Sequence, residues 1–323
     1  MDEDTGKFDP MYQTIHVDEK WFYLNKTQRR VYLTQAEYED EDKLPVAKGN
    51  KRHRLKVMFL CAVARPRYDI HRKKWFDGKL GIWPFTCVAP AKRNSKRRPK
   101  GTPETKPVNV TAAIYKEFML EKVLPAIMKK WPPSYRKHPI WINEDNSRCH
   151  PESVRKAMQE AAALKGWDIR GRHQPANSPD FNVLDLGFFN SIQSLHYKSD
   201  PKDIDELVAN VHKAFNKVSK ETLDNTFMSL QLCMELSLER AGNNTYKLGH
   251  QHKKKKRNKS ALPYNVVPQE TLEKGFHVLG GPCMHIPTPI HPLLAAEEDS
   301  DPGFSSSCID SGSSSVKVES AIL

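Results

Sequence analysis

Hydrophobic and polar positions divide the first part of the chain into segments with strand-like spacing. Residues 14–24 form an apolar and aromatic run that predicts a strand, and residues 29–34 predict the second strand of a hairpin. The continuous apolar run at 55–64 is typical of a central strand that is covered on both faces. Three strands in succession predict the first half of a mixed sheet, and residues 76–89 predict two more short strands.

The second part of the chain alternates between helical and strand-like spacing. This alternation predicts the crossover connections of an α/β sheet. Asn109 is expected to cap the first helix, which Pro125 should kink. The predicted elements are a helix at 109–130, a strand at 138–142, a helix at 152–165, a strand at 167–170, a helix from Leu184 onward, and helices at 203–218 and 221–238.

Acidic residues interrupt these patterns at three places. Asp18 lies with Glu19 in the middle of the first strand, where acids are depleted, so that its presence needs a reason. Asp145 follows a short buried strand; because strand side chains alternate, it and Glu144 point to opposite faces, and we choose Asp145 as the site residue. Asp185 falls in a first helical turn, where an acid is also favoured simply by the helix dipole.

The sequence around these acids resembles the signature blocks of mariner-like transposases. The blocks read HVDEKWFYL, EDNSRCH and PANSPDFNVLDLGFF, and the resemblance extends from about residue 11 to about residue 259. It is greatest to the plant and oomycete-type branch, whose triad is three aspartates with thirty-nine residues between the second and third, the number found here. The chain departs from the family at Glu144, usually glutamine, and at Ser147, usually alanine.

The resemblance implies a ribonuclease-H-like α/β fold, a mixed sheet flanked by helices. It implies that Asp18, Asp145 and Asp185 are the catalytic triad and bind two Mg²⁺ or Mn²⁺ ions. Three clustered aspartates would repel one another unless divalent charge neutralised them. Asn146 and His150 match family positions near the second aspartate, and their roles stay open.

The implied activity is metal-dependent cleavage and strand transfer of DNA, as in cut-and-paste transposition. The implied partners are double-stranded DNA and a second copy of the chain on paired transposon ends, without a membrane or a small-molecule substrate. Two alternatives remain open. One is a catalytically silent or domesticated remnant that binds DNA non-specifically, and the other is a nuclease of the same fold without transposition.

Charge supports a polyanionic partner without separating DNA from RNA. The 323 residues include 51 Lys and Arg against 39 Asp and Glu, a formal net charge of +12. Two basic runs are either solvated segments or DNA-backbone contacts, and the second is alternatively a nuclear-import signal, consistent with a nuclear location. The candidates are Lys92, Arg93, Lys96, Arg97, Arg98 and Lys100 in the loop 91–106, and Lys253, Lys254, Lys255, Lys256 and Arg257 in the run 252–259.

Domain organisation follows from composition and from the resemblance. We expect a disordered lead at 1–10, the catalytic domain at 11–240, a basic and proline-containing extension at 241–294, and an acidic, serine-rich disordered tail at 295–323. Only 17 residues precede Asp18, so the family's N-terminal helix-turn-helix region is expected to be missing. The segment 262–291 is expected to be irregular, and Cys283, His285 and His291 within it do not complete a zinc set. The six cysteines are scattered and are expected to be reduced, and no signal peptide is predicted.

Overall fold

A five-stranded mixed sheet forms the centre of the computed structural model. The model describes residues 8–24, 55–94, 98–199, 201–243, 245–249, 253 and 267–278. The strand order is β5-β2-β1-β8-β9, in which β1 is antiparallel to β2 and parallel to β8. The predicted mixed α/β sheet is therefore confirmed. Its strands are β1 (Thr14–Tyr23), β2 (Lys56–Ala64), β5 (Lys79–Pro84), β8 (Ile140–Glu144) and β9 (Ile169–His173).

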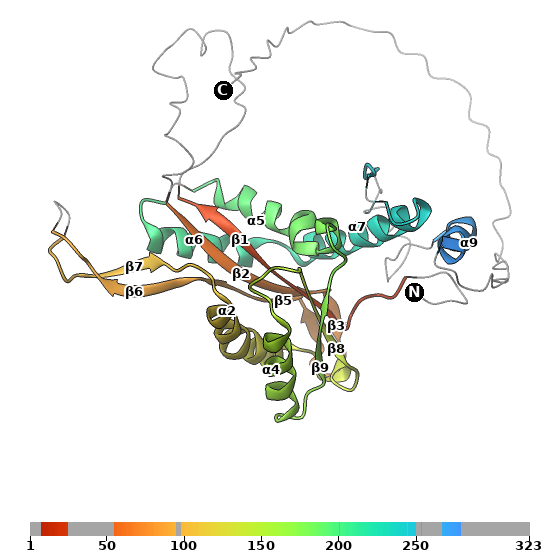
Figure 1. The fold of residues 1–323 in the computed structure, drawn as a ribbon, viewed down its shortest axis with the longest axis horizontal. Helices are drawn as coiled ribbons and strands as arrows, with labels where there is room; N and C mark the ends of the chain where they lie inside the picture. Colours follow the sequence, from red (N-terminus) through yellow and green to blue (C-terminus); the bar gives the residue numbers. More distant parts are fainter. Residues whose placement is uncertain are drawn as a thin grey trace, which may run out of the picture. The chain divides into compact units, whose positions relative to one another are not determined.

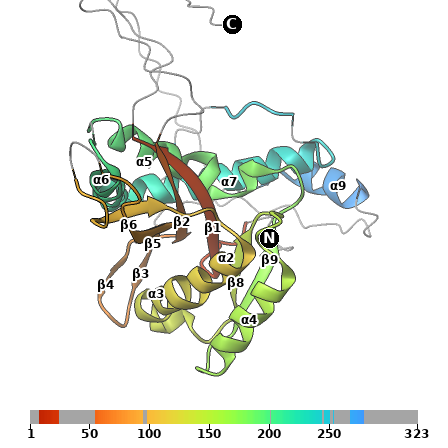
Figure 2. The same cartoon turned by 60° about the vertical axis from the view of Figure 1, so that its left-hand side comes forward.

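Helices cover both faces of this sheet (Figures 1 and 2). One face carries α5 (Phe189–His196), α6 (Ile204–Lys217) and α7 (Lys220–Glu239), drawn in green and teal. The other carries α2 (Ala112–Phe118), the π-helical turn η3 (Met119–Val123), α3 (Leu124–Lys130) and α4 (Glu152–Ala163). The described part of the chain contains no helix long and apolar enough to cross a bilayer.

Strand β2 shows why its continuous apolar run belongs at the centre of the sheet. Val57, Phe59 and Cys61 pack into the core under α5, α6 and α7, whereas Leu60 and Ala62 pack into the core on the opposite face. Because side chains alternate along a strand, only an unbroken apolar run can supply both cores. The predicted central strand at 55–64 is confirmed.

Shorter elements connect the main ones. Two-stranded hairpins are formed by β3 (Arg67–Asp69) with β4 (Lys74–Phe76), and by β6 (Thr86–Pro90) with β7 (Pro103–Pro107). Short helical turns are η4 (Pro133–Tyr135), η5 (Pro179–Phe181) and η6 (Leu184–Phe188). After α7, helix α9 (Gln269–Val278) packs against that helix.

Several sequence predictions need correction. The helix predicted from Asn109 is capped instead by Thr111, whose hydroxyl accepts a hydrogen bond from the Ile114 N–H. The predicted loop 91–106 contains strand β7, and the segment predicted to be irregular contains helix α9. Phe8, in the predicted disordered lead, is buried against Val267 and Leu272. The predicted strand at 29–34 and the tail at 295–323 lie outside the described residues.

Candidate active site

Asp18 lies midway along β1 and is 8% exposed. Its Oδ1 accepts a hydrogen bond from the Glu19 N–H at 2.7 Å, and it has no ion-pair partner among the described residues. Burial raises the pKa of Asp18 well above its usual range, and the negative charges of Asp185, Glu19 and Asp145 raise it further. Two acids from distant parts of the chain, Asp145 and Asp185, therefore act on this strand together with the neighbouring Glu19.

Asp145 follows β8 directly and begins a turn. Its Oδ1 accepts a hydrogen bond from the Ser147 N–H at 3.0 Å and lies 2.7 Å from Nδ1 of His150. The hydrogen bond from His150 lowers the pKa of the Asp145 carboxyl against the opposing effect of burial. Asp145 is thus ionised and held in place by a cationic side chain.

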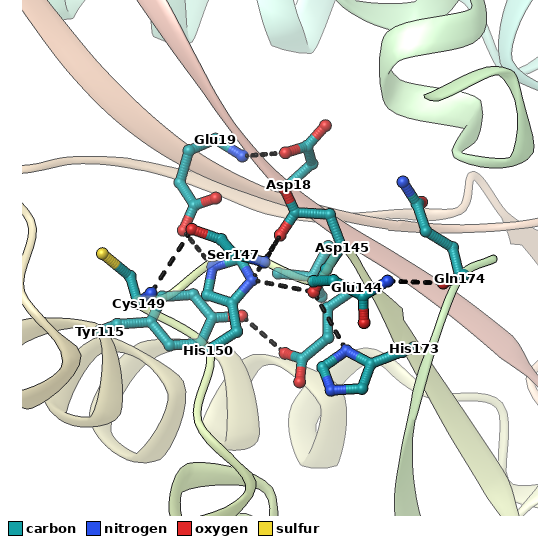
Figure 3. Close-up of polar contacts among 12 residues, drawn as sticks. Asp18, Glu19, Tyr115, Glu144, Asp145, Ser147, Cys149, His150, His173 and Gln174 are labelled. Carbon is teal, nitrogen blue, oxygen red and sulfur yellow. Dashed lines mark hydrogen bonds and ion pairs between the residues drawn. The ribbon is translucent and has the colours of Figure 1, made fainter. Parts of the chain in front are cut away.

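His150 connects Asp145 to the first strand, as Figure 3 shows. Its Nε2 lies 2.9 Å from Oε1 of Glu19, and its ring packs on that of Tyr115 with centroids 4.0 Å apart. Burial alone would lower the pKa of His150, but the hydrogen bonds to Asp145 and Glu19 outweigh it and set this pKa at about 11. The imidazole is therefore protonated at neutral pH and donates through both nitrogens.

Glu144, the last residue of β8, has different partners from Asp145. Its Oε2 accepts a hydrogen bond from the Tyr115 hydroxyl at 2.9 Å, and its Oε1 accepts one from Nη1 of Arg155 at 3.2 Å. Glu144 is 1% exposed, on the side of the sheet covered by α2 and α4. Its charge is balanced on that side, so it does not add a carboxylate to the group around Asp18.

Asp185 is the second residue of η6, the predicted first turn of the helix that continues as α5. Its Oδ1 accepts a hydrogen bond from Nζ of Lys20 at 3.0 Å, and both side chains are about one third exposed, at 35% and 34%. Lys20 follows Asp18 by two positions on β1, so both point to the same face of the sheet. Asp185 therefore reaches the Asp18 side of the sheet while paired with a neighbouring cation.

Asn182 holds the Asp185 segment on β1, and sequence reasoning did not identify it. Its Nδ2 donates to the carbonyl of Val17 at 3.2 Å, and its Oδ1 accepts from the N–H of Leu184 at 3.0 Å. Asn182 is 1% exposed. An asparagine between two apolar residues of a turn was the available signal, but its partner on β1 is 165 positions away.

The other predicted residues have varied surroundings. Nδ2 of Asn146 donates to the carbonyl of Gln174 at 3.0 Å, which ties the turn after β8 to the end of β9. Nζ of Lys253 donates to the carbonyl of Asn225 at 2.7 Å and contacts Ser229 on α7. Lys92, Arg93, Arg98 and Lys100 lie on the connection between β6 and β7, whereas Lys96, Arg97, Lys254, Lys255, Lys256 and Arg257 lie outside the described residues.

The chemistry of this group fits a divalent metal, although two of its three aspartates are paired with cations. Asp145 is turned to His150 and Asp185 to Lys20, whereas Asp18 has no counter-charge within the part of the chain that the structure describes. Among the described residues, no three His, Cys, Asp or Glu side chains stand where they could jointly hold an ion in this arrangement. Carboxylate oxygens are the ligands that Mg²⁺ and Mn²⁺ prefer. Asp18, Asp145 and Asp185 are the residues that could hold such ions after their side chains turn.

Solved structures with a similar course of the chain include several of a mariner transposase. The catalytic domain of Mos1 mariner transposase is 14% identical with a TM-score of 0.41, over 68% of this chain and 78% of that one. A pre-cleavage Mos1 transpososome is 16% identical with a TM-score of 0.47, over 68% of this chain and 53% of that one. The Mos1 mariner paired-end complex with Mn is 16% identical with a TM-score of 0.44, over 68% of this chain and 53% of that one. No protein-family profile and no curated protein matches the chain.

Proposed function

We propose that this chain acts as the catalytic domain of a mariner-like transposase, cleaving DNA phosphodiester bonds and transferring the cut strand with the help of divalent metal ions. The convergence of like charge on Asp18 carries the proposal. Asp145 and Asp185 come from separate elements, yet both raise the pKa of this buried carboxyl. The three signature blocks of the sequence contain these same aspartates.

The residues around the site have separate roles in this proposal. Asp18, Asp145 and Asp185 would hold two Mg²⁺ or Mn²⁺ ions, which supply the charge that activates a water and stabilises the leaving oxygen of a phosphodiester. His150 and Glu19 hold Asp145 in its orientation, and Asn182 holds the segment that carries Asp185.

Lys20 has two successive partners in this proposal. It pairs with Asp185 in the metal-free chain, on the same face of β1 as Asp18. With Asp185 engaged by such an ion, the Lys20 ammonium group would be available to contact a phosphate oxygen of the DNA beside the site. Because this contact is made to the DNA backbone, it serves cleavage by water and attack by a DNA 3′-hydroxyl equally.

The partner proposed is duplex DNA, bound by a pair of chains on two transposon ends in the nucleus. The net charge of +12 supports a polyanionic partner, and phosphate contacts supply affinity without sequence information. Sedimentation of the chain with and without duplex DNA measures whether two copies assemble. A fluorescent fusion expressed in cells measures the location.

Cleavage of end-labelled duplex DNA by the purified chain in Mn²⁺ or Mg²⁺ tests the activity. The test variant is Asp145→Asn, and the matched control is Asp168→Asn, which removes an exposed carboxylate that pairs with Arg170 outside the site. We expect cleavage by the wild type and the control, and none by Asp145→Asn.

The other outcomes identify the alternatives. If neither wild type nor variants cleave while salt-dependent DNA binding is intact, the chain is a silent DNA-binding remnant. If cleavage occurs but a pre-cut 3′-hydroxyl end is never joined to a target duplex, the chain is a nuclease of this fold.

A further inference from the structure

The hairpin of β6 and β7 extends the sheet beyond its edge as a separate ribbon. Strand β5 is the edge strand, and the chain continues from it through Phe85, whose N–H donates to the carbonyl of Met58 at 2.8 Å. The N–H of Val108 then donates to the carbonyl of Phe85 at 2.9 Å and closes the base of the hairpin. Figure 1 shows the ribbon, in orange, projecting away from the five-stranded sheet.

Neither face of this ribbon is fully covered. No residue of β6 or β7 is buried, and Val88 is 72% exposed. A hydrogen bond ties the ribbon to α6, from the Thr105 hydroxyl to Oδ1 of Asp205 at 2.6 Å. An isolated two-stranded ribbon is marginally stable in water, so a ribbon this exposed gains stability from a partner that covers it.

The ribbon concentrates positive charge. Residues 86–107 contain seven Lys and Arg and one Glu, a formal charge of +6, which is half of the net charge of the chain. Glu104 is paired with Arg98 and lies 3.4 Å from Lys106, so that the acid is already neutralised. The described cations Lys92, Arg93 and Lys100 are exposed and have no ion pair with any described residue.

These features favour a nucleic acid duplex over another protein strand as the partner. Pro90, Pro103 and Pro107 lack the N–H that a strand added to the edge would need, and dense positive charge at an edge opposes strand addition. A polyanion meets no such obstacle. A two-stranded ribbon also has the width that the major groove of B-DNA admits.

The position of the ribbon relates it to Asp18. Asp18 is aligned with Cys61 on β2, and Cys61 with Ile82 on β5, so about 10 Å separates Asp18 from Ile82 across two strand spacings. Phe85 follows the end of β5 about 10 Å further on, and the ribbon adds about 17 to 20 Å. The far ends of the two strands, at Pro90 and Pro103, lie within roughly 40 Å of Asp18 along this path, and one turn of B-DNA spans about 34 Å.

We propose that the β6–β7 ribbon is an arm that binds duplex DNA about one helical turn from the bond held at Asp18, with Lys92, Arg93 and Lys100 contacting backbone phosphates. The proposal rests on the proposed function, since it takes the DNA held at the triad as its reference point. It adds a binding surface that is separate from the chemistry.

The test compares two triple variants with the same loss of charge. The ribbon variant is Lys92→Gln, Arg93→Gln, Lys100→Gln. The control is Lys137→Gln, Lys156→Gln, Lys165→Gln, at exposed positions before β8, on α4 and after it. Both sets are exposed, and equal thermal midpoints would show that both variants are folded.

The measurement is the slope of log affinity against log salt concentration for a labelled duplex of two helical turns. Three lost phosphate contacts should reduce the slope by about 2.7 in the ribbon variant, and the control slope should stay at the wild-type value. Shortening the duplex so that it ends within half a turn of the cleavage position should remove the difference between wild type and ribbon variant.

Three results would overturn the proposal. The first is a ribbon variant whose salt slope equals that of the wild type. The second is a control variant whose slope falls as much as that of the ribbon variant. The third is a slope that depends on the ribbon with duplex RNA but not with duplex DNA. Failure of the proposed function would give a different result. The wild type would not cleave DNA with either Mg²⁺ or Mn²⁺, while the ribbon variant would still have a smaller salt slope than the wild type.

Discussion

Replacing Asn182 by alanine should destabilise the protein and loosen the segment that carries Asp185. The amide of Asn182 is hydrogen-bonded to two backbone groups, the Val17 carbonyl and the Leu184 N–H. Val17 and Leu184 are both 0% exposed, so bulk water does not reach these groups once the amide is removed.

The magnitude follows from the two backbone groups that lose their partner. Leaving one buried donor or acceptor unpaired costs about 1 to 3 kcal/mol. Two such groups give a loss of about 2 to 6 kcal/mol in the free energy of unfolding, out of the roughly 5 to 15 kcal/mol that a folded domain has. The matched control is Asn216→Ala on the exposed surface of α6, which should change stability by less than about 0.5 kcal/mol.

Denaturant unfolding measures the free energies of unfolding, and amide hydrogen exchange shows which segments are destabilised. Exchange should accelerate in η6, and DNA cleavage should fall with it because Asp185 loses its fixed position. A loss below about 0.5 kcal/mol at unchanged m value, or uniform acceleration of exchange without an effect at η6, would refute the reasoning.

Three further predictions concern the charged site in the metal-free protein, measured in EDTA unless stated. Asp18→Asn should raise the stability at neutral pH, because burial and like charges raise the pKa of Asp18 and the substitution removes that charge. Single stabilising substitutions typically contribute about 0.5 to 2 kcal/mol, and a lower melting temperature for the variant would contradict the prediction. The free energy of unfolding should fall as the pH rises from about 7 to 10, because the pKa of His150 is about 11 in the folded protein against 6.5 in the unfolded chain. The stabilisation by His150 is therefore complete below pH 6.5 and is lost as the pH approaches 11. His150→Gln should flatten this pH dependence, and an equally steep curve in the variant would exclude His150 as its source. Lys20→Met should tighten Mn²⁺ binding in the absence of DNA and EDTA, seen by calorimetry, because it removes the cation that competes for Asp185; weaker binding would show that Lys20 does not compete.

The parts of the fold that follow local rules could be predicted from the sequence. The alternation and apolar content around Asp18 and before Asp145 predicted β1 and β8, and helical spacing after Leu184 predicted the turn that carries Asp185. Each of these inferences depends on neighbours within a few residues, for which periodicity is informative.

The contacts that organise the site could not be predicted in this way. His150 bridges Glu19 and Asp145, and the Glu19 contact spans 131 positions in the sequence. Nothing in a local pattern says which acid a histidine will meet across a sheet. Strand β7 was missed for a different reason, because its prolines argue against a strand and are tolerated only where no ladder hydrogen bond is lost, as on this exposed ribbon.

The balance of charge at the site bears on the metal binding that the proposed function requires. Asp18, Glu19, Asp145 and Asp185 contribute four negative charges when ionised, and His150 and Lys20 return two positive ones. The sum leaves a deficit of two positive charges at the site. Asp18 has no ion-pair partner among the described residues, and burial together with the like charges around it raises its pKa. One divalent ion would cancel that deficit. A second ion would exceed it unless a DNA phosphate joined the site, so the same carboxylates that repel one another in the metal-free site would couple full metal loading to the presence of substrate.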